Sequence, residues 1–203
     1  IEFIASGPTA PDSTTYADAI SVLKRYSIWD KVPNSVKQVL LRGLRGGLPE
    51  TPKPNDVIFN NVANILVASN YLSLKAMESE ARSLGYNVLI VTSMMEGEAR
   101  EVGKFVSSII KHVKQYDEPI KKPAVLLMGG ETTVTVRGKG IGGRNQELAL
   151  SVAIGISGMR GIVFASIGSD GIDGISDAAG AVVDGNTVNE GKKFGLDPYE
   201  VLN

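Results

Sequence analysis

The chain contains 203 residues, 43% of them apolar, and its mean hydropathy of +0.05 is typical of a globular protein with a sizeable core. A formal charge of −1, with no long basic run, argues against nucleic-acid binding. The sequence has no cysteine, which excludes disulfides, thiolate catalysis and cysteine-held metals.

His112 is the only histidine and lies beside the apolar stripe of a predicted helix, where we expect a structural or solvated role. Serine-histidine-acid catalysis and two-histidine metal motifs therefore have little basis. No apolar run reaches about 18 residues and no cleavable signal is visible, so a cytoplasmic protein is expected. Because the chain begins with strand-like residues and without methionine, we expect a fragment.

The first part of the chain predicts two short helices after a turn. Residues 1–6 are typical of a strand that runs into Ser6-Gly7-Pro8-Thr9, a stiff turn that either contacts an anion or simply ends the strand. Residues 15–26 and 34–44 have helical apolar spacing, and hydroxyl and aspartate residues supply an N-cap for the first helix. Three prolines make residues 48–55 the best linker candidate, so the first domain is expected over residues 1–55.

Residues 56–203 alternate strand and helix patterns, which predicts an α/β domain with a mostly parallel sheet flanked by helices. The continuous apolar run at 124–128 predicts a strand in the middle of that sheet. A threonine-valine alternation at 132–136 predicts a half-buried strand. The other strands are expected at 64–68, 87–92, 161–167 and 181–183, and the helices at 70–84, 98–115, 144–156 and 187–194.

A glycine cluster between the apolar run and the following helix is the best candidate for an anion site. Glycines occupy positions 138, 140, 142 and 143, and Arg144 opens the helix. An anion placed there would meet backbone amides, a helix N-terminus and a guanidinium. The alternative is a tight turn with a solvated arginine, although Glu131 nearby favours a site.

The glycines also satisfy G-x-G-x-x-G, so a dinucleotide fold has to be considered. The match is weak, because the ribose-binding acid expected about 20 residues later is absent there and Asp170 comes too late. No P-loop is present, since neither serine nor threonine follows Lys139 in the required frame.

Three aspartates, Asp170, Asp173 and Asp177, follow a predicted buried strand. Their spacing does not fit an EF-hand loop. They would bind Mg²⁺, orient a substrate hydroxyl or accept its proton. The alternative is a purely structural role, because Asp-Gly pairs are common in turns. Several acids and an arginine near glycine amides suit phosphoryl transfer.

Several sequence blocks together resemble the glycerate kinases that form 2-phosphoglycerate. The blocks are SGPT at 6–9, GGETTV at 129–134, GGRNQE at 142–147, GSDGIDG at 168–174 and DAAG at 177–180. The part from about Val62 resembles the family's carboxyl-terminal, Rossmann-like MOFRL domain, and the part before the linker resembles the end of its amino-terminal α/β domain. The resemblance implies transfer of a phosphoryl group from ATP, with Mg²⁺, to the 2-hydroxyl of D-glycerate.

The resemblance also implies roles for residues. Arg144 would neutralise phosphate or carboxylate charge, with Glu131 and Asn145 orienting it. Asp170 and Asp173 would be catalytic and contact Mg²⁺ or the substrate hydroxyl. The remaining residues expected to bind substrate or phosphate are Ser6, Gly7, Thr9, Gly130, Thr132, Gly142, Gly143 and Asp177.

The chain departs from the family in extent, because the family's amino-terminal half and final segment are absent. We therefore expect the missing half of the enzyme as a partner, and a fragment that is inactive alone remains an open alternative. A homodimer is also open. The competing functions are an NAD(P)H-dependent hydroxypyruvate reductase and a non-catalytic module that binds a nucleotide or carboxylate.

Overall fold

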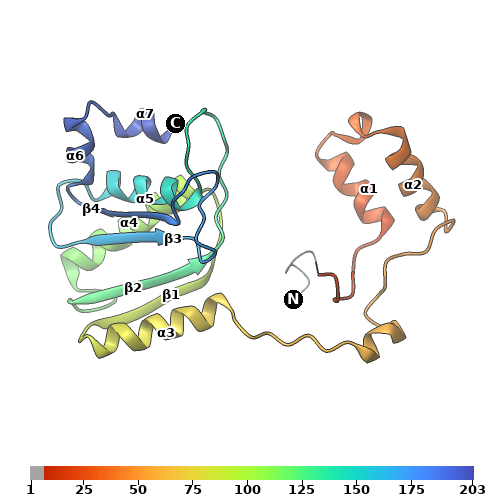
Figure 1. Cartoon of the computed structure of the whole chain (residues 1–203), viewed down its shortest axis with the longest axis horizontal. Coiled ribbons are helices and arrows are strands. Elements are labelled where there is room, and N and C mark those ends of the chain that lie inside the picture. Colours follow the sequence, from red (N-terminus) through yellow and green to blue (C-terminus); the bar gives the residue numbers. More distant parts are fainter. Residues whose placement is uncertain (1–6) are drawn as a thin grey trace. The chain divides into compact units, whose positions relative to one another are not determined.

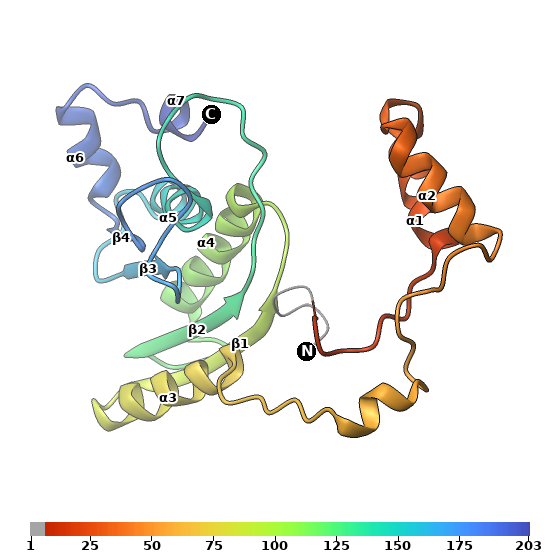
Figure 2. The same ribbon diagram turned by 45° about the vertical axis from the view of Figure 1, so that its right-hand side comes forward.

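The computed structural model describes residues 7–203. The chain divides into two compact units, Ile1–Val67 and Ala68–Asn203 (Figures 1 and 2). The expected strand at residues 1–6 lies outside the described residues. The predicted domain division after residue 55 stays a prediction. None of the helices in residues 7–203 combines the length and the apolar character that crossing a bilayer requires.

The first unit consists of short helices. They are α1 (Tyr16–Arg25), η2 (Trp29–Lys31), α2 (Asn34–Leu44) and η3 (Val57–Asn61), so the two predicted helices are confirmed. A capping box starts α1, because the Thr15 side chain accepts from the Asp18 amide and the Asp18 carboxylate accepts from the Thr15 amide at 2.9 Å. The strand expected at residues 64–68 is absent, and this segment is irregular and mostly exposed.

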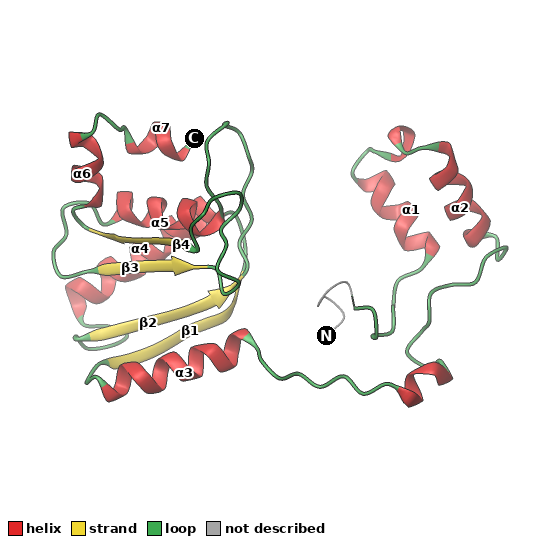
Figure 3. Ribbon diagram, in the orientation of Figure 1, coloured by secondary structure: helices red, strands yellow, loops and turns green. Residues whose placement is uncertain are grey.

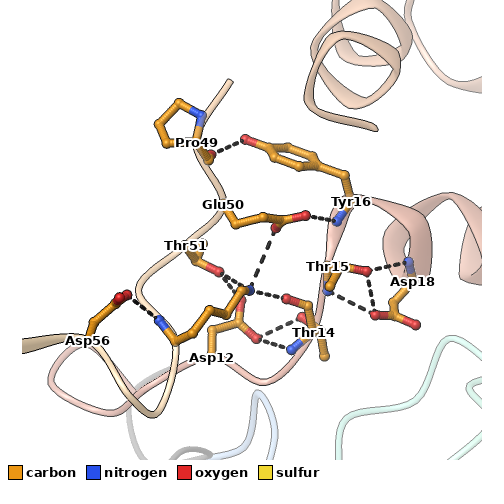
Figure 4. Close-up of polar contacts among 10 residues, drawn as sticks. Asp12, Thr14, Thr15, Tyr16, Asp18, Pro49, Glu50, Thr51 and Asp56 are labelled. Carbon is orange, nitrogen blue, oxygen red and sulfur yellow. Dashed lines mark hydrogen bonds and ion pairs between the residues drawn. The ribbon is translucent and has the colours of Figure 1, made fainter. Parts of the chain in front are cut away.

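The segment expected to be a linker is held against the start of α1 (Figure 4). Lys53 donates to the Thr14 carbonyl and, at 3.0 Å, to the Thr51 hydroxyl. Thr51 in turn donates to the Asp12 carboxylate at 2.8 Å. Hydrogen bonds from Thr14 and Thr51 lower the pKa of Asp12 to about 2. The proline-rich segment therefore packs as part of the first unit.

The second unit carries all four strands found in residues 7–203 (Figure 3). Its elements are α3 (Asn70–Ser83), β1 (Asn87–Met95), α4 (Ala99–Tyr116), β2 (Ala124–Gly130), α5 (Arg144–Gly155), β3 (Val163–Ile167), β4 (Gly180–Asp184), α6 (Thr187–Lys193) and α7 (Pro198–Leu202). The predicted alternation of strands and helices is confirmed here, and α7 is an addition that the sequence pattern did not indicate.

The strands form two pairs rather than one mostly parallel sheet. β1 and β2 are parallel, with Asn87 opposite Ala124 and Met95 opposite Gly130. β3 and β4 are antiparallel, with Val163 opposite Asp184. The expectation that β2 lies in the middle of a sheet is wrong for this structure, because β1 is its only hydrogen-bonded neighbour among the described strands.

The strand expected at 132–136 is also absent, apart from one bridge between Thr133 and Glu98. The reason is that this segment bonds to the β1–α4 connection instead. The Thr133 amide donates to the Gly97 carbonyl at 2.8 Å, and the Thr135 amide donates to the Glu98 carboxylate at 2.7 Å.

The core lies between α4, α5 and the strands. α4 turns one apolar face inward, while His112 stays exposed on its other side next to Tyr116. The main cluster of buried residues consists of Ala99 and Val106 from α4 with Leu148, Val152 and Ile156 from and after α5. This rigid helix pair carries the N-terminus of α5, where the candidate site begins.

Candidate functional site

Two loops gather at the N-terminus of α5. Residues 131–143 connect β2 to α5, and residues 168–179 connect β3 to β4. β2 and β3 point the same way, so both loops begin at the same end of the strands (Figure 3). Ligands of α/β proteins commonly bind at this end.

Asp173 joins the second loop to α5. One of its carboxylate oxygens accepts from the Asn145 amide at 2.9 Å and from the Asn145 side chain at 3.1 Å, and the other accepts from the Gln146 amide at 2.8 Å. The residue is only 1% exposed. Gly143 has no side chain, and a methyl group there would overlap the Asp173 carboxylate. Asp173 therefore caps α5 from another part of the chain.

This geometry gives Asp173 a role other than the expected contact with Mg²⁺. Both of its oxygens are used by amides that need an acceptor, and it has no open face toward solvent. The expected anion site changes as well, because the first free amides of α5 already bind a carboxylate. The anion-binding groups that stay accessible are the Arg144 side chain and the glycine loop.

Side chains from neighbouring segments connect this cap to β3. Ser166 donates to the Asn145 side-chain oxygen at 2.7 Å, and Gln146 donates to the Ser176 hydroxyl at 2.6 Å. Ser176 also donates to the Asp173 carbonyl at 2.8 Å. Asn145, which we expected to orient Arg144, is thus part of the network that fixes the helix start.

Arg144 and Glu131 form the ion pair that the sequence suggested. Their closest atoms are 2.5 Å apart, and a longer contact of 3.4 Å reaches the carbonyl of the buried Thr132. The pair is accessible, with the two side chains 46% and 78% exposed, respectively. The chain enters this loop at Gly130. Only glycine fits there, because its φ of +153° and the close backbone of Met95 leave no room for a side chain.

Asp170 and Asp177 are both exposed. One oxygen of Asp170 accepts from the Ile172 amide at 3.2 Å, which leaves the other free. Within residues 7–203, no three acidic or histidine side chains are close enough to hold a metal ion together. Mg²⁺ usually takes only one or two protein carboxylates and completes its shell with water and phosphate oxygens. Asp170 fits such a site, and Asp173 does not.

The expected residues of the first unit are only partly described. Ser6 lies outside the described residues. Gly7 accepts from the Ala10 amide at 3.0 Å in a turn, and Thr9 donates to Asn64 at 2.5 Å. Their contact with a ligand stays a prediction, as do the ligand contacts of Gly142 and Gly143.

The sequence patterns gave no indication of Arg100, which braces the back of α5. Its guanidinium binds Glu147 at 2.9 Å, the Leu202 carbonyl at 2.6 Å and the Asn203 side chain at 2.9 Å. Arg100 is nearly buried, with 11% of its side chain exposed.

Comparison with family models finds a match for the part of the chain that contains this site. Residues 124–203 match the MOFRL family, and residues 1–41 match a domain of unknown function, DUF4147. The region that matches the MOFRL model holds Glu131, Arg144 and all three aspartates of the second loop.

The chain also resembles longer curated proteins. It is 46% identical to a glycerate 2-kinase of Pyrococcus horikoshii and 46% identical to a D-glycerate 2-kinase of Thermotoga maritima. The match covers 100% of this chain and 45% of each relative, so the chain spans less than half of their length. A protein of Agrobacterium vitis described as a putative hydroxypyruvate reductase is 40% identical over 98% of the chain and 44% of its own length.

Solved structures agree with the sequence matches. The crystal structure of a glycerate kinase from Thermotoga maritima matches with a TM-score of 0.78 at 46% identity. A Pyrococcus horikoshii structure matches with a TM-score of 0.69. Each match covers 99% of this chain and 45% of the other.

Proposed function

We propose that this chain is part of a glycerate 2-kinase, which transfers the terminal phosphoryl group of ATP to the 2-hydroxyl of D-glycerate. The observation that carries the proposal is the accessible Arg144–Glu131 pair next to the aspartate loop, in a chain 46% identical to two proteins named for this activity. The bond from the Asn145 amide to Asp173 keeps the aspartate loop next to the start of α5, which carries Arg144.

In this proposal, Arg144 binds the phosphate or the glycerate carboxylate. Phosphoryl transfer spreads negative charge over the moving group, so a fixed guanidinium lowers the barrier if it contacts that group. Its position on the first turn of a capped helix limits the freedom of its backbone. Binding to Arg144 requires that Glu131 be displaced or share the guanidinium.

Asp170 is the carboxylate that we assign to Mg²⁺ or to the substrate hydroxyl, and Asp177 supports it from the same loop. Mg²⁺ would neutralise phosphate charge in the complex. The free oxygen of Asp170 is suited either to hold this ion with water and phosphate, or to accept the hydroxyl proton. Gly7 and Thr9, with Ser6, are the proposed ligand contacts of the first unit.

Hydroxypyruvate reduction is the second candidate, because relatives 40% and 37% identical are described as putative hydroxypyruvate reductases. The geometry of the glycines argues against it. A dinucleotide fingerprint lies in the tight turn directly after a strand, whereas here residues 131–137 separate β2 from the glycine cluster.

The decisive experiment is to assay the full gene product with ATP, Mg²⁺ and D-glycerate, and separately with NADH and hydroxypyruvate. We expect ATP-dependent formation of 2-phosphoglycerate and no NADH consumption. A rise in melting temperature with ATP–Mg²⁺ but without turnover would instead favour a binding module.

Arg144→Ala tests the role of the guanidinium. We expect kcat/KM to fall by roughly 150-fold or more, equivalent to about 3 kcal/mol of transition-state stabilisation. Arg137→Ala is the matched control, because it removes the same charge from an exposed position in the same loop. Activity of Arg144→Ala within tenfold of the parent would remove this residue from the mechanism.

A further inference from the structure

A cavity in the second unit lies at the end of β3 opposite the candidate site. It is lined by the connection from α5 to β3, residues 156–162, and by the connection from β4 to α6, residues 184–189. Its volume of about 370 Å³ is within the range of small-molecule sites. The cavity lies before β3 and the aspartate loop follows it, so the 5 residues of this strand separate the two by about 15 Å (Figure 3).

Backbone contacts hold the two walls of this distal cavity together. The Gly158 amide donates to the Gly185 carbonyl at 2.7 Å. Gly185 is buried, and a methyl group there would overlap the backbone of Met159, so the two connections can approach only because this residue is glycine. The Met159 side chain packs against the main core cluster. The distal cavity is therefore built into the fold of the unit before any ligand arrives.

Positive charge collects at one wall. Arg160 lines the cavity, and its exposed guanidinium forms neither an ion pair nor a hydrogen bond with any residue of the described chain. Lys114, in the last turn of α4, places its ammonium 3.6 Å from the position that a Cβ atom on Gly161 would take. No carboxylate in residues 7–203 pairs with this ammonium either. Two neighbouring cations without an acidic partner favour an anionic ligand.

The other wall carries polar groups of a different kind. Asp184 accepts from the Asn186 and Thr187 amides through one oxygen, at 2.9 Å each, and its second oxygen has no donor among the described residues. The Asn189 side chain lines the cavity and makes no hydrogen bond within the described chain. A carboxylate oxygen and a side-chain amide suit hydroxyl groups. A bare anion would meet the negative charge of Asp184, whereas a ligand with an anionic end and a hydroxyl end avoids it.

We propose that the distal cavity binds a small phosphate ester that also carries hydroxyl groups. Its phosphate contacts Arg160 and Lys114, and its hydroxyl groups contact Asp184 and Asn189. Because β3 separates this ligand from Arg144, it occupies a second site rather than the candidate site. The inference rests on the cavity and its charges, and it holds whether or not the chain takes part in phosphoryl transfer.

Isothermal titration calorimetry of the chain with three probes tests the class of ligand. Glycerol 3-phosphate has both a phosphate and hydroxyl groups, and we expect a Kd of about 1 mM or tighter. Inorganic phosphate lacks the hydroxyl end and should bind at least fivefold more weakly. Glycerol lacks the charge and should give no measurable binding.

Four variants test the place of binding, with circular dichroism to show that each is folded. Arg160→Ala should weaken glycerol 3-phosphate at least tenfold, and Asn189→Ala should weaken it at least threefold. Lys192→Ala is the matched control, because it removes an exposed cation one helical turn from Asn189 that does not line the cavity, and it should change the Kd less than twofold. Arg144→Ala should also leave this binding unchanged.

Each of several results would overturn the proposal. Absence of glycerol 3-phosphate binding would remove the site, and equal binding of inorganic phosphate would show that the hydroxyl contacts do not exist. Binding that is lost in Arg144→Ala but kept in Arg160→Ala would assign the ligand to the candidate site. An equal loss in Lys192→Ala and Arg160→Ala would indicate a general attraction of anions to the surface.

Discussion

Asp173→Ala should destabilise the second unit far more than removal of an exposed aspartate from the same loop. The Asp173 carboxylate accepts three hydrogen bonds at the N-terminus of α5 and is 1% exposed. Loss of an N-cap costs about 1–2 kcal/mol, and each partly buried donor left without an acceptor adds about 1 kcal/mol or more. We therefore expect a loss of about 3 kcal/mol.

Urea unfolding followed by far-UV circular dichroism measures this loss. With a slope of about 1.5 kcal/mol per molar urea, the midpoint of the second unit should fall by about 2 M. Fluorescence of Trp29, the only tryptophan, reports on the first unit and should not change. Asp170→Ala is the matched control and should stay within about 0.5 kcal/mol.

The reasoning would be refuted if Asp173→Ala unfolded at the same urea concentration as the parent chain. It would also be refuted if Asp170→Ala cost as much, because the bonds to the α5 amides would then not explain the loss. Asp173→Asn keeps the shape and one acceptor oxygen, so we expect an intermediate midpoint.

Further expectations concern backbone, packing and pH. Gly130→Ala should lower the free energy of unfolding by more than about 2 kcal/mol, because the φ of +153° and the adjacent backbone exclude a methyl group. Gly140→Ala faces open space and should be nearly neutral in thermal denaturation. Arg100→Ala leaves Glu147 partly buried without its cation and should cost about 2–3 kcal/mol in urea unfolding; a loss below about 0.5 kcal/mol would contradict the bracing role. The pKa of Asp12 is lowered from 3.8 to about 2, so its carboxylate stabilises the first unit above about pH 4, and this contribution is lost as the pH falls through 2. Tryptophan fluorescence melts between pH 4 and 2 should show a falling midpoint, and a smaller fall in Asp12→Asn.

Helices were predictable from the sequence because their signals are local. The apolar stripe of α4 lies within that helix, and the residues that cap α1 directly precede it. Both helices form where expected. The strands β1, β2 and β3 were recognisable for the same reason. Their pairing was not, because it depends on residues far away in the chain.

β2 illustrates this limit. Its apolar run has the composition of a central strand, yet only one of its edges is paired among the described strands, so its position in the sheet could not follow from the run alone. The antiparallel direction of β4 depends on the loop of residues 168–179 after β3, which reverses the chain. Residues 132–136 alternate like a strand, but the Glu98 side chain takes the amide of Thr135.

For the candidate site, the structure joins some of the residues that the sequence singled out, namely Glu131 to Arg144 and Asp173 to Asn145. Spacing predicted that Arg144 and the aspartates share one edge, and the bond from Asp173 to Asn145 agrees with this. Spacing could not distinguish a buried helix cap from an exposed ligand contact, because both require an aspartate in a glycine-rich loop. Only the burial of Asp173 and the exposure of Asp170 separate the two roles.

If Arg144 binds the ligand as proposed, the Glu131 carboxylate that is already paired with it makes ligand binding an exchange reaction. An incoming anion gains only the difference between its own contact and the one that Glu131 gives up, while the released Glu131 is readily hydrated at its 78% exposed position. A singly charged carboxylate offers the guanidinium little that Glu131 does not. A doubly charged phosphate offers more, so under the proposed function the competing Glu131 would favour highly charged ligands at Arg144.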